Sequence, residues 1–296
     1  MAQRVIIVEN NQTVSKRKLA LLFRRIAAGG IALLAASASF YASAEDGLHS
    51  TFDNLLSKYV TPISNGASTQ VDYGGFKLER AKLNKYLGRL AKVEQSTFDS
   101  WDKDKQLAFL INAYNAYTIE LILTEYPDIE SIRDLGSFFS SPWKKEIAPL
   151  LGKTRTLDEI EHELIRGTNQ TTQTYNEPRI HFAVNCASIG CPALREEAYL
   201  GDKIDLQLEA QTTRFLADTS RNKMSGDTLY LSKIFDWYSE DFDRESGEWR
   251  KTSSLNEFLL LYKDSMQLTE AQVSSLKNDT ADIEYLDYDW ALNAAK

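Results

Sequence analysis

The two cysteines of the chain lie in one short segment, together with one of its three histidines. Residues 179–194 read RIHFAVNCASIGCPAL and contain His181, Cys186 and Cys191. Thiols and imidazoles are the side chains that most readily act as nucleophiles or exchange protons near neutral pH. The sequence therefore predicts that any reaction centre of this protein lies at this segment.

The first hypothesis is a cysteine nucleophile. Cys186 is the candidate, because Pro192 directly follows Cys191 and stiffens its position. His181, five residues before Cys186, is the preferred base, and His162 is the alternative. Cysteine hydrolases and acyltransferases use such a thiol–imidazole pair, so the expected reaction is attack on an amide or ester of the cell envelope. In papain-like and transglutaminase-like enzymes the nucleophile usually begins the central helix, whereas here the cysteines come later, so the analogy rests on chemistry alone.

The residues that would orient the base lie on a helix predicted over 105–126 and ended by Pro127. Apolar side chains cover every face of this helix, so we expect it to be surrounded by protein. Asn112, Asn115 and Glu120 fall on roughly one side of it. Buried amides and carboxylates need hydrogen-bond partners. We therefore expect Asn115 to converge with the two histidines near the cysteine loop.

Two other arrangements of the same side chains stay open. In an oxidising compartment Cys186 and Cys191 would form a structural disulfide, and the domain would then bind an envelope peptide, glycan or partner protein without catalysis. Alternatively, both cysteines with His162 and His181 would make a zinc set, but the four-residue gaps fit known spacings poorly, so no metal is predicted. The sequence has no phosphate-binding glycine loop and no dinucleotide fingerprint, so no cofactor is predicted.

The helices and strands that must position these residues are predicted from the spacing of apolar residues and from capping and turn residues. Alternating residues predict a strand over Ile180–Val184 that leads into the cysteine loop. Thr156-Leu157-Asp158-Glu159 is a capping box that begins a helix carrying His162. The aromatic residues Trp237, Tyr238 and Phe242 are expected in the core. The remaining expected elements are helices over 48–59, 78–90, 206–216, 234–242 and 255–262, a hairpin over 147–156, a strand over 228–231, and a docked tail over 283–292. The predicted fold class is a helix-rich α+β single domain with a small antiparallel sheet packed on the central buried helix, for which a papain-like or transglutaminase-like architecture would fit.

Residues 1–44 have the pattern of a secretory signal peptide. Basic residues over 16–25 precede an apolar, alanine-rich run over 26–38, and Ala42-Ser43-Ala44 matches a cleavage site. The apolar run is shorter than the roughly 20 residues of a spanning helix, so cleavage is favoured over a retained anchor and no stable membrane insertion is expected. We therefore expect one domain over 45–296, located in the periplasm or secreted.

The charge of the chain restricts its partners. The formal net charge is −8, and loss of the six basic residues and one acidic residue of the leader would leave about −13. Nucleic acids and anionic lipids bind basic patches, and no such cluster follows residue 44. We expect no nucleic-acid partner; the partner or substrate is an unknown molecule of the cell envelope.

Five stretches in this order resemble the domain of unknown function 547 family: LAFLINAYNAYTIELIL, LDEIEHELIR, RIHFAVNCASIGCPAL, IFDWYSEDF and YLDYDWALN. The resemblance extends from roughly Leu48 to Asn293. It implies that the asparagine helix, the His162 helix and the histidine–cysteine segment are the characteristic pieces of the family. It implies no activity, because the family is defined without one.

Overall fold

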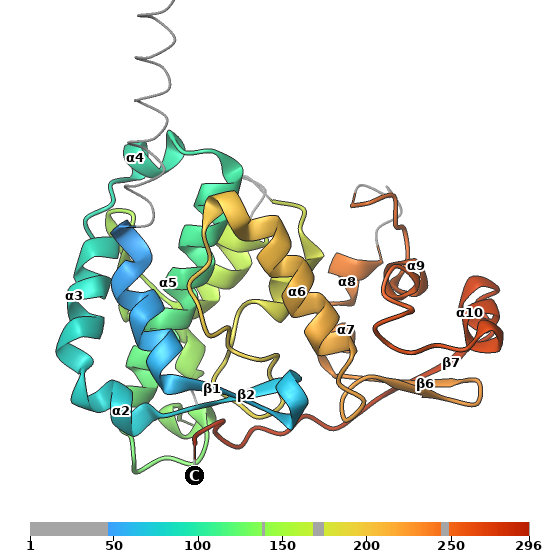
Figure 1. Cartoon of the computed structure of the whole chain (residues 1–296). Coiled ribbons are helices and arrows are strands. Elements are labelled where there is room, and N and C mark those ends of the chain that lie inside the picture. Colours follow the sequence, from blue (N-terminus) through green and yellow to red (C-terminus); the bar gives the residue numbers. More distant parts are fainter. Residues whose placement is uncertain (1–46, 138–139, 168–174, 244–248, 296) are drawn as a thin grey trace, which may run out of the picture. The chain divides into compact units, whose positions relative to one another are not determined.

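The computed structural model of the chain describes residues 47–137, 140–167, 175–243 and 249–295 (Figure 1). The predicted signal peptide over 1–44 lies outside the described residues. From Leu48 onward the chain forms one compact unit. No helix in these described ranges is both long and apolar enough to cross a bilayer. The expected fold class, a helix-rich α+β single domain, is confirmed.

Helix α5 (Lys103–Leu123) lies at the centre of the larger hydrophobic cluster. The Asp102 side chain caps it by accepting a hydrogen bond from the Lys105 N–H at 2.8 Å. Every residue from 106 to 119 is buried. The helix is therefore enclosed on all sides, as its sequence predicts, and each polar group on it must find a partner inside the protein.

Other helices provide most of the packing around α5. The first described helix covers 47–59 and runs beside it in Figure 1. The others near it are α2 (Tyr73–Leu78), α3 (Arg80–Leu90), α4 (Gln95–Asp99) and α6 (Ile204–Leu216). The helices predicted over 48–59, 78–90 and 206–216 are thus confirmed to within two residues at each end.

Within the described ranges, the strands divide among three small sheets rather than one. Strands β1 (Val60–Ile63) and β2 (Ser68–Val71) pair antiparallel, as do β3 (Ala148–Leu150) and β4 (Lys153–Arg155). The second pair is the predicted hairpin, and Gly152 adopts the positive φ of +77° that its turn requires. In the third sheet, β6 (Thr228–Leu231) pairs antiparallel with β5 (Lys223–Ser225) and parallel with β7 (Asp282–Tyr285).

A second hydrophobic cluster contains Phe182, Phe215, Phe235 and Phe258. Phe215 comes from α6, and Phe182 comes from the segment just before the cysteine loop. The third sheet and four short helices supply the rest, namely α7 (Ile234–Trp237), α8 (Ser239–Phe242), α9 (Leu255–Leu260) and α10 (Glu270–Lys277). The single helix predicted over 234–242 is therefore two helices, because Tyr238 leaves helical geometry at ψ 27°. Phe242 is buried as expected, but Trp237 is 44% exposed, so its assignment to the core is wrong.

The strand predicted over Ile180–Val184 is also wrong. Residues Pro178–Phe182 form a 3-10 helix, η5, in which the Ala183 N–H donates to the Ile180 carbonyl at 2.9 Å. Pro178 suits the first position of a helix, where its fixed φ is favourable and no N–H is needed. His181 is therefore carried by a helical turn that ends just before the cysteine loop.

The tail after β7 runs across the cysteine loop and ends beside β2. The Gly190 and Ile189 N–H groups each donate to a tail carbonyl at 2.8 Å, and the Asn293 N–H donates to the Ala187 carbonyl at 3.0 Å. Farther along, the Val71 N–H donates to the Asn293 carbonyl at 2.9 Å. The predicted docking of segment 283–292 onto the core is confirmed.

Candidate functional site

A pocket of about 240 Å³ lies where the cysteine loop meets α7, the tail and the π-helical segment η4 (Glu159–Ile165). Its lining includes Cys186, His162 and His181. The structure thus brings these three predicted side chains to one concave site. Concave sites lined by aromatic side chains with a few polar groups are the usual places for ligands.

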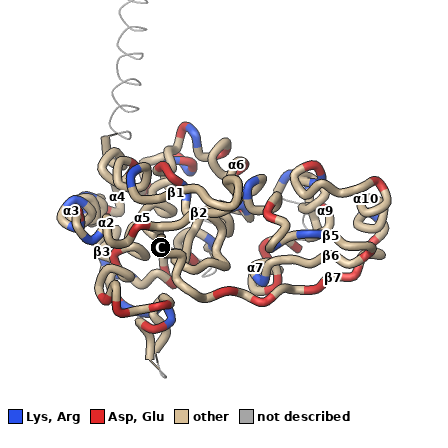
Figure 2. The backbone as a smooth tube through the Cα atoms, turned by 60° about the horizontal axis from the view of Figure 1, so that its bottom comes forward, with Lys and Arg blue, Asp and Glu red and all other residues tan. Residues whose placement is uncertain are grey.

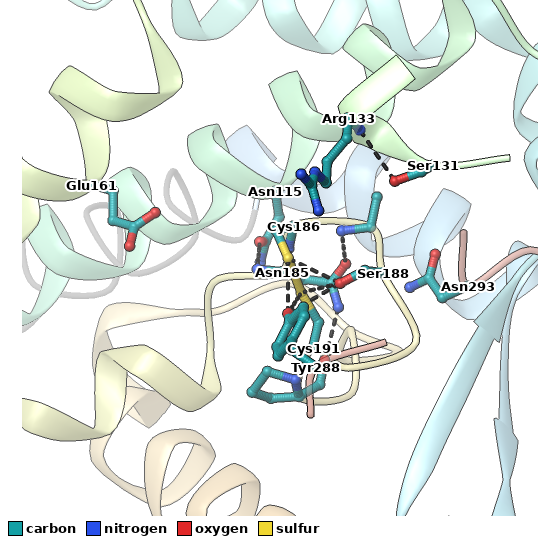
Figure 3. Close-up of a disulfide and its surroundings, with 12 residues drawn as sticks. Asn115, Ser131, Arg133, Glu161, Asn185, Cys186, Ser188, Cys191, Tyr288 and Asn293 are labelled. Carbon is teal, nitrogen blue, oxygen red and sulfur yellow. Dashed lines mark hydrogen bonds between the residues drawn. A yellow bond between two sulfur atoms is a disulfide. The ribbon is translucent and has the colours of Figure 1, made fainter. Parts of the chain in front are cut away.

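Cys186 and Cys191 are joined by a disulfide (Figure 3). Cys191 Sγ accepts hydrogen bonds from the Cys186 N–H at 2.9 Å and from the Tyr288 hydroxyl at 3.1 Å. The Ser188 hydroxyl lies 3.2 Å from Cys186 Sγ. The disulfide interpretation is confirmed, and the chain has no free thiol in this structure.

Asparagine side chains hold the entry to the disulfide loop. Asn115 donates to the Ala183 carbonyl at 3.0 Å and accepts from the Asn185 N–H at 2.9 Å. The Asn185 side chain in turn donates to the Pro192 carbonyl at 2.7 Å. Asn115 therefore fixes the backbone that leads into the loop, although its side chain does not line the pocket.

The other two polar residues predicted on α5 lie away from the pocket lining. Asn112 binds both the carbonyl and the N–H of Tyr199, at 2.7 and 2.9 Å. Glu120 forms an ion pair with Arg80 at 2.6 Å. Each side chain satisfies its hydrogen bonds within the protein, and the structure does not bring either of them to the histidines.

His181 belongs to a charged cluster that joins three elements. Its Nε2 lies 2.7 Å from Asp241 Oδ2, and Arg166 Nε donates to the same oxygen at 2.6 Å. Burial lowers the pKa of His181, so the neutral ring donates its Nε2–H to the carboxylate. Burial opposes ionisation of Asp241, but these contacts outweigh it and hold the pKa of Asp241 below its usual range. Because His181 is neutral, Arg166 carries the charge that compensates Asp241.

His162 is held by charged neighbours on its own helix. Arg166 Nη1 lies 3.0 Å from His162 Nδ1, and His162 Nε2 lies 3.6 Å from Asp158 Oδ1. A guanidinium offers only donors. The Nδ1 atom must therefore be the acceptor, so the ring is the tautomer with its proton on Nε2, on the side of Asp158.

Glu161 is a buried carboxylate on the pocket lining, only 5% exposed. Its Oε1 accepts a hydrogen bond from the Tyr238 hydroxyl at 2.6 Å. Burial, with the nearby Glu161 charge, raises the pKa of Tyr114 and Tyr238. Both phenols therefore stay protonated, and Tyr238 donates to this carboxylate.

Aromatic rings from three parts of the chain form one wall of the pocket. Tyr288 and Trp290 come from the tail, with ring centroids 4.6 Å apart. Trp237 of α7 lies 4.8 Å from Tyr288, and Trp143 lies 5.8 Å from Trp290. Tyr288 and Trp290 are two positions apart in an extended segment, so they project to the same side. We call these four residues the aromatic wall.

The zinc arrangement does not form. Both sulfur atoms are in the disulfide, and the described residues contain no group of three or more histidine, cysteine, aspartate or glutamate side chains placed to hold a metal ion. The pocket therefore offers organic side chains and a disulfide to a ligand.

Sequence reasoning missed Asp241, Glu161 and the aromatic wall. Glu161 directly precedes His162 in LDEIEHELIR, and Asp241 lies within IFDWYSEDF. Both stretches stand among the five that carry the family resemblance, which was the available signal. Their roles depend on contacts between residues far apart in the sequence, such as the 60 positions that separate His181 from Asp241.

Comparison with known protein families finds a match to the central part of the chain, which contains part of the site. Residues 98–216 match the model of the family described as "Protein of unknown function, DUF547". The match includes α5, η4, η5 and both cysteines. No curated protein and no solved structure matches the chain. The segment 98–216 of this chain therefore belongs to the domain of unknown function 547 family.

Proposed function

We propose that this chain is an exported, non-catalytic domain that binds a peptide, glycan or partner protein of the cell envelope in the pocket. The observation that carries the proposal is the disulfide. It uses both cysteines, and the loop that it closes holds the tail whose rings line the pocket.

The contacts of the loop support the role of a clasp. Tyr288 reaches both sulfur atoms with its hydroxyl, at 3.1 Å each, while its ring lines the pocket. The Gly190 N–H donates to the Asp289 carbonyl at 2.8 Å, between the two pocket-lining rings of the tail. A covalent loop loses less entropy when it is ordered, so the disulfide helps to hold this wall ready for a ligand.

The pocket supplies the first test. We expect Val184→Phe, which enlarges a buried lining residue, to weaken binding of soluble peptidoglycan fragments by at least about tenfold, because the added ring occupies ligand volume. Binding is measured by tryptophan fluorescence, since Trp143, Trp237 and Trp290 line the pocket. Leu78→Phe is the control, because Leu78 is 88% exposed and not a lining residue. Equal affinity of the two variants would place the binding site elsewhere.

One observation favours a second function. Cys186 lines the same pocket as His162 and His181, so reduction by a dithiol would place a thiol beside two imidazoles. In that state the Cys186 thiolate would attack an acyl carbon of an envelope amide or ester and form a thioester. An imidazolium would then protonate the leaving amine or alcohol, and water would release the acid. This is the cysteine hydrolase or acyltransferase hypothesis, restricted to the reduced protein.

A thiol titration separates the two functions. We expect native, unreduced protein to contain no reactive thiol and denatured, reduced protein to contain two, because the chain has two cysteines and both are in the disulfide. The measurement is reaction with a chromogenic disulfide reagent before and after reduction. Two reactive thiols in the native protein, with hydrolytic activity that Cys186→Ser abolishes and Cys191→Ser retains, would replace the binding proposal by the enzymatic one.

A further inference from the structure

The pocket lining contains two carboxylates, Asp158 and Glu161, and no lysine or arginine. We propose that the pocket binds an organic ammonium group, with Glu161 as its counter-ion and the aromatic wall as its cation–π surface. The inference rests on the proposed binding function and names the class of ligand.

Glu161 is the first reason. The residue is 5% exposed, and its carboxylate accepts a hydrogen bond from the Tyr238 hydroxyl at 2.6 Å. No ion pair to Glu161 occurs among the residues that the structure describes. A buried carboxylate is costly unless a cation and good hydrogen bonds compensate it. Figure 3 shows this carboxylate directed from its helix toward the side on which the disulfide lies.

The rings are the second reason. Trp237, Tyr288 and Trp290 pack with centroid distances of 4.6 to 5.6 Å, so they present a continuous π surface to the pocket. Two rings that line the pocket already receive a cation in this structure: Arg133 lies 5.3 Å from the Trp290 centroid, and Arg166 lies 5.0 Å from that of Tyr238. Indole and phenol faces attract ammonium groups by the same electrostatics.

The surrounding charge is the third reason. Arg166, the cation nearest to the histidines, is paired with Asp241 at 2.6 Å and with Glu240 at 2.5 Å, so its charge is compensated. Acidic residues recur along β7 and the tail segment that follows it (Figure 2), including Asp287 and Asp289 beside the aromatic wall. Arg133, which lies against Trp290, is a cation on the same side. The acidic residues offset its charge and favour the association of a cationic ligand.

The volume limits what enters. At about 240 Å³ the pocket is below the roughly 300–1,000 Å³ of sites for drug-sized ligands. It suits an ammonium group with a short aliphatic stem. Such a group occurs on a free small amine or on a lysine-type side chain of an envelope peptide, and the test includes a probe for each source.

The experiment measures binding by calorimetry to the full chain with its disulfide intact. The probes are tetramethylammonium for a free amine, N-acetyl-lysine amide for a peptide amine, and N-acetyl-norleucine amide as the neutral counterpart. We expect at least one ammonium probe to bind and the neutral probe to bind at least about tenfold more weakly. Glu161→Gln, which keeps an acceptor for Tyr238, is expected to weaken ammonium binding by at least about tenfold. Glu125→Gln removes an exposed carboxylate on the surface and is expected to leave it unchanged.

The outcomes distinguish this inference from the function on which it rests. Equal binding of the neutral and charged probes, or full affinity in Glu161→Gln, overturns the ammonium assignment. Trp237→Leu gives a second test through a half-exposed residue, and unchanged ammonium affinity there overturns the cation–π surface. Binding of peptidoglycan fragments that Val184→Phe abolishes and Glu161→Gln retains would keep the proposed function and reject the ammonium group. No binding of any probe or fragment rejects both.

Discussion

Lowering the pH from 7 to 4 is expected to decrease the free energy of unfolding by about 3 kcal/mol through His49 alone. Burial, with smaller contributions from the charges of Arg89 and Lys105, lowers the pKa of His49 from 6.5 to about 3. The unfolded chain binds a proton at this position below pH 6.5, whereas the folded chain does so only near pH 3. The stabilisation is therefore complete above pH 6.5 and decreases as the pH falls toward 3.

His49→Gln provides the matched variant. His49 Nδ1 lies 2.7 Å from the Tyr86 hydroxyl, and a glutamine amide keeps a partner for that hydroxyl without a titrating group. Urea unfolding is measured at a series of pH values between 7 and 4 for both proteins. We expect the loss of stability with acid to be smaller in the variant by about 3 kcal/mol. Parallel pH curves for the two proteins would contradict the prediction. His181, whose pKa burial also lowers, contributes in the same direction in both.

Asp241→Leu is expected to destabilise the protein by about 3–5 kcal/mol. The substitution removes the carboxylate between His181 and Arg166, at 2.7 and 2.6 Å. The Arg166 side chain is only 8% exposed, so it would keep a buried charge that has lost its buried counter-ion. The free energy of unfolding is measured by urea titration at pH 7.

Glu240→Gln is the control for Asp241→Leu. Glu240 contacts the same guanidinium at 2.5 Å, but its side chain is 74% exposed. Solvent screens such a pair, so the expected change is below about 1 kcal/mol. If both substitutions lower the free energy of unfolding by the same amount, burial does not determine how much each ion pair contributes to stability. A loss below about 1 kcal/mol for Asp241→Leu would show that the cluster does not hold α8 to η5.

The sequence predicts best where one local signal decides the structure. Helix α5 has apolar residues on every face, and such a pattern leaves no solvent-facing side. The capping box also forms as predicted, with the Glu159 N–H donating to Thr156 Oγ1 at 3.0 Å and the Thr156 N–H donating to Glu159 Oε2 at 2.7 Å. Both signals lie within a few residues, so no distant contact can easily reverse them.

The error at Ile180–Val184 has a physical cause. The strand was predicted from the alternation of polar and apolar residues, which assumes that polar side chains face solvent. Here Arg179 and His181 are each 3% exposed. Arg179 pairs with Asp205 at 2.7 Å, and His181 contacts Asp241 at 2.7 Å. Polar residues buried through distant partners imitate a strand pattern, and those partners cannot be read from the local sequence.

The sequence predicts the cysteine and the two histidines of the candidate site, but not the carboxylate and the aromatic rings around them. Cys186, His162 and His181 do line one pocket, because the unusual residue types marked them. Glu161 and the tail rings have common residue types and become distinctive only through position. A single sequence does not reveal that the Tyr288 hydroxyl contacts the disulfide at Cys191, 97 residues earlier in the chain.

The route of the tail has a consequence for the order in which the molecule assembles. Tyr73 donates its hydroxyl proton to Asn293 Oδ1 at 2.7 Å across 220 positions, and contacts so remote in sequence form late because loop closure must precede them. The aromatic wall is therefore completed after the helices around α5 have packed, and it is also the part most able to detach without melting them. A ligand held by Tyr288 and Trp290 binds only the docked tail. Occupancy of the pocket should thus slow hydrogen exchange at the tail amides while leaving exchange in α5 unchanged.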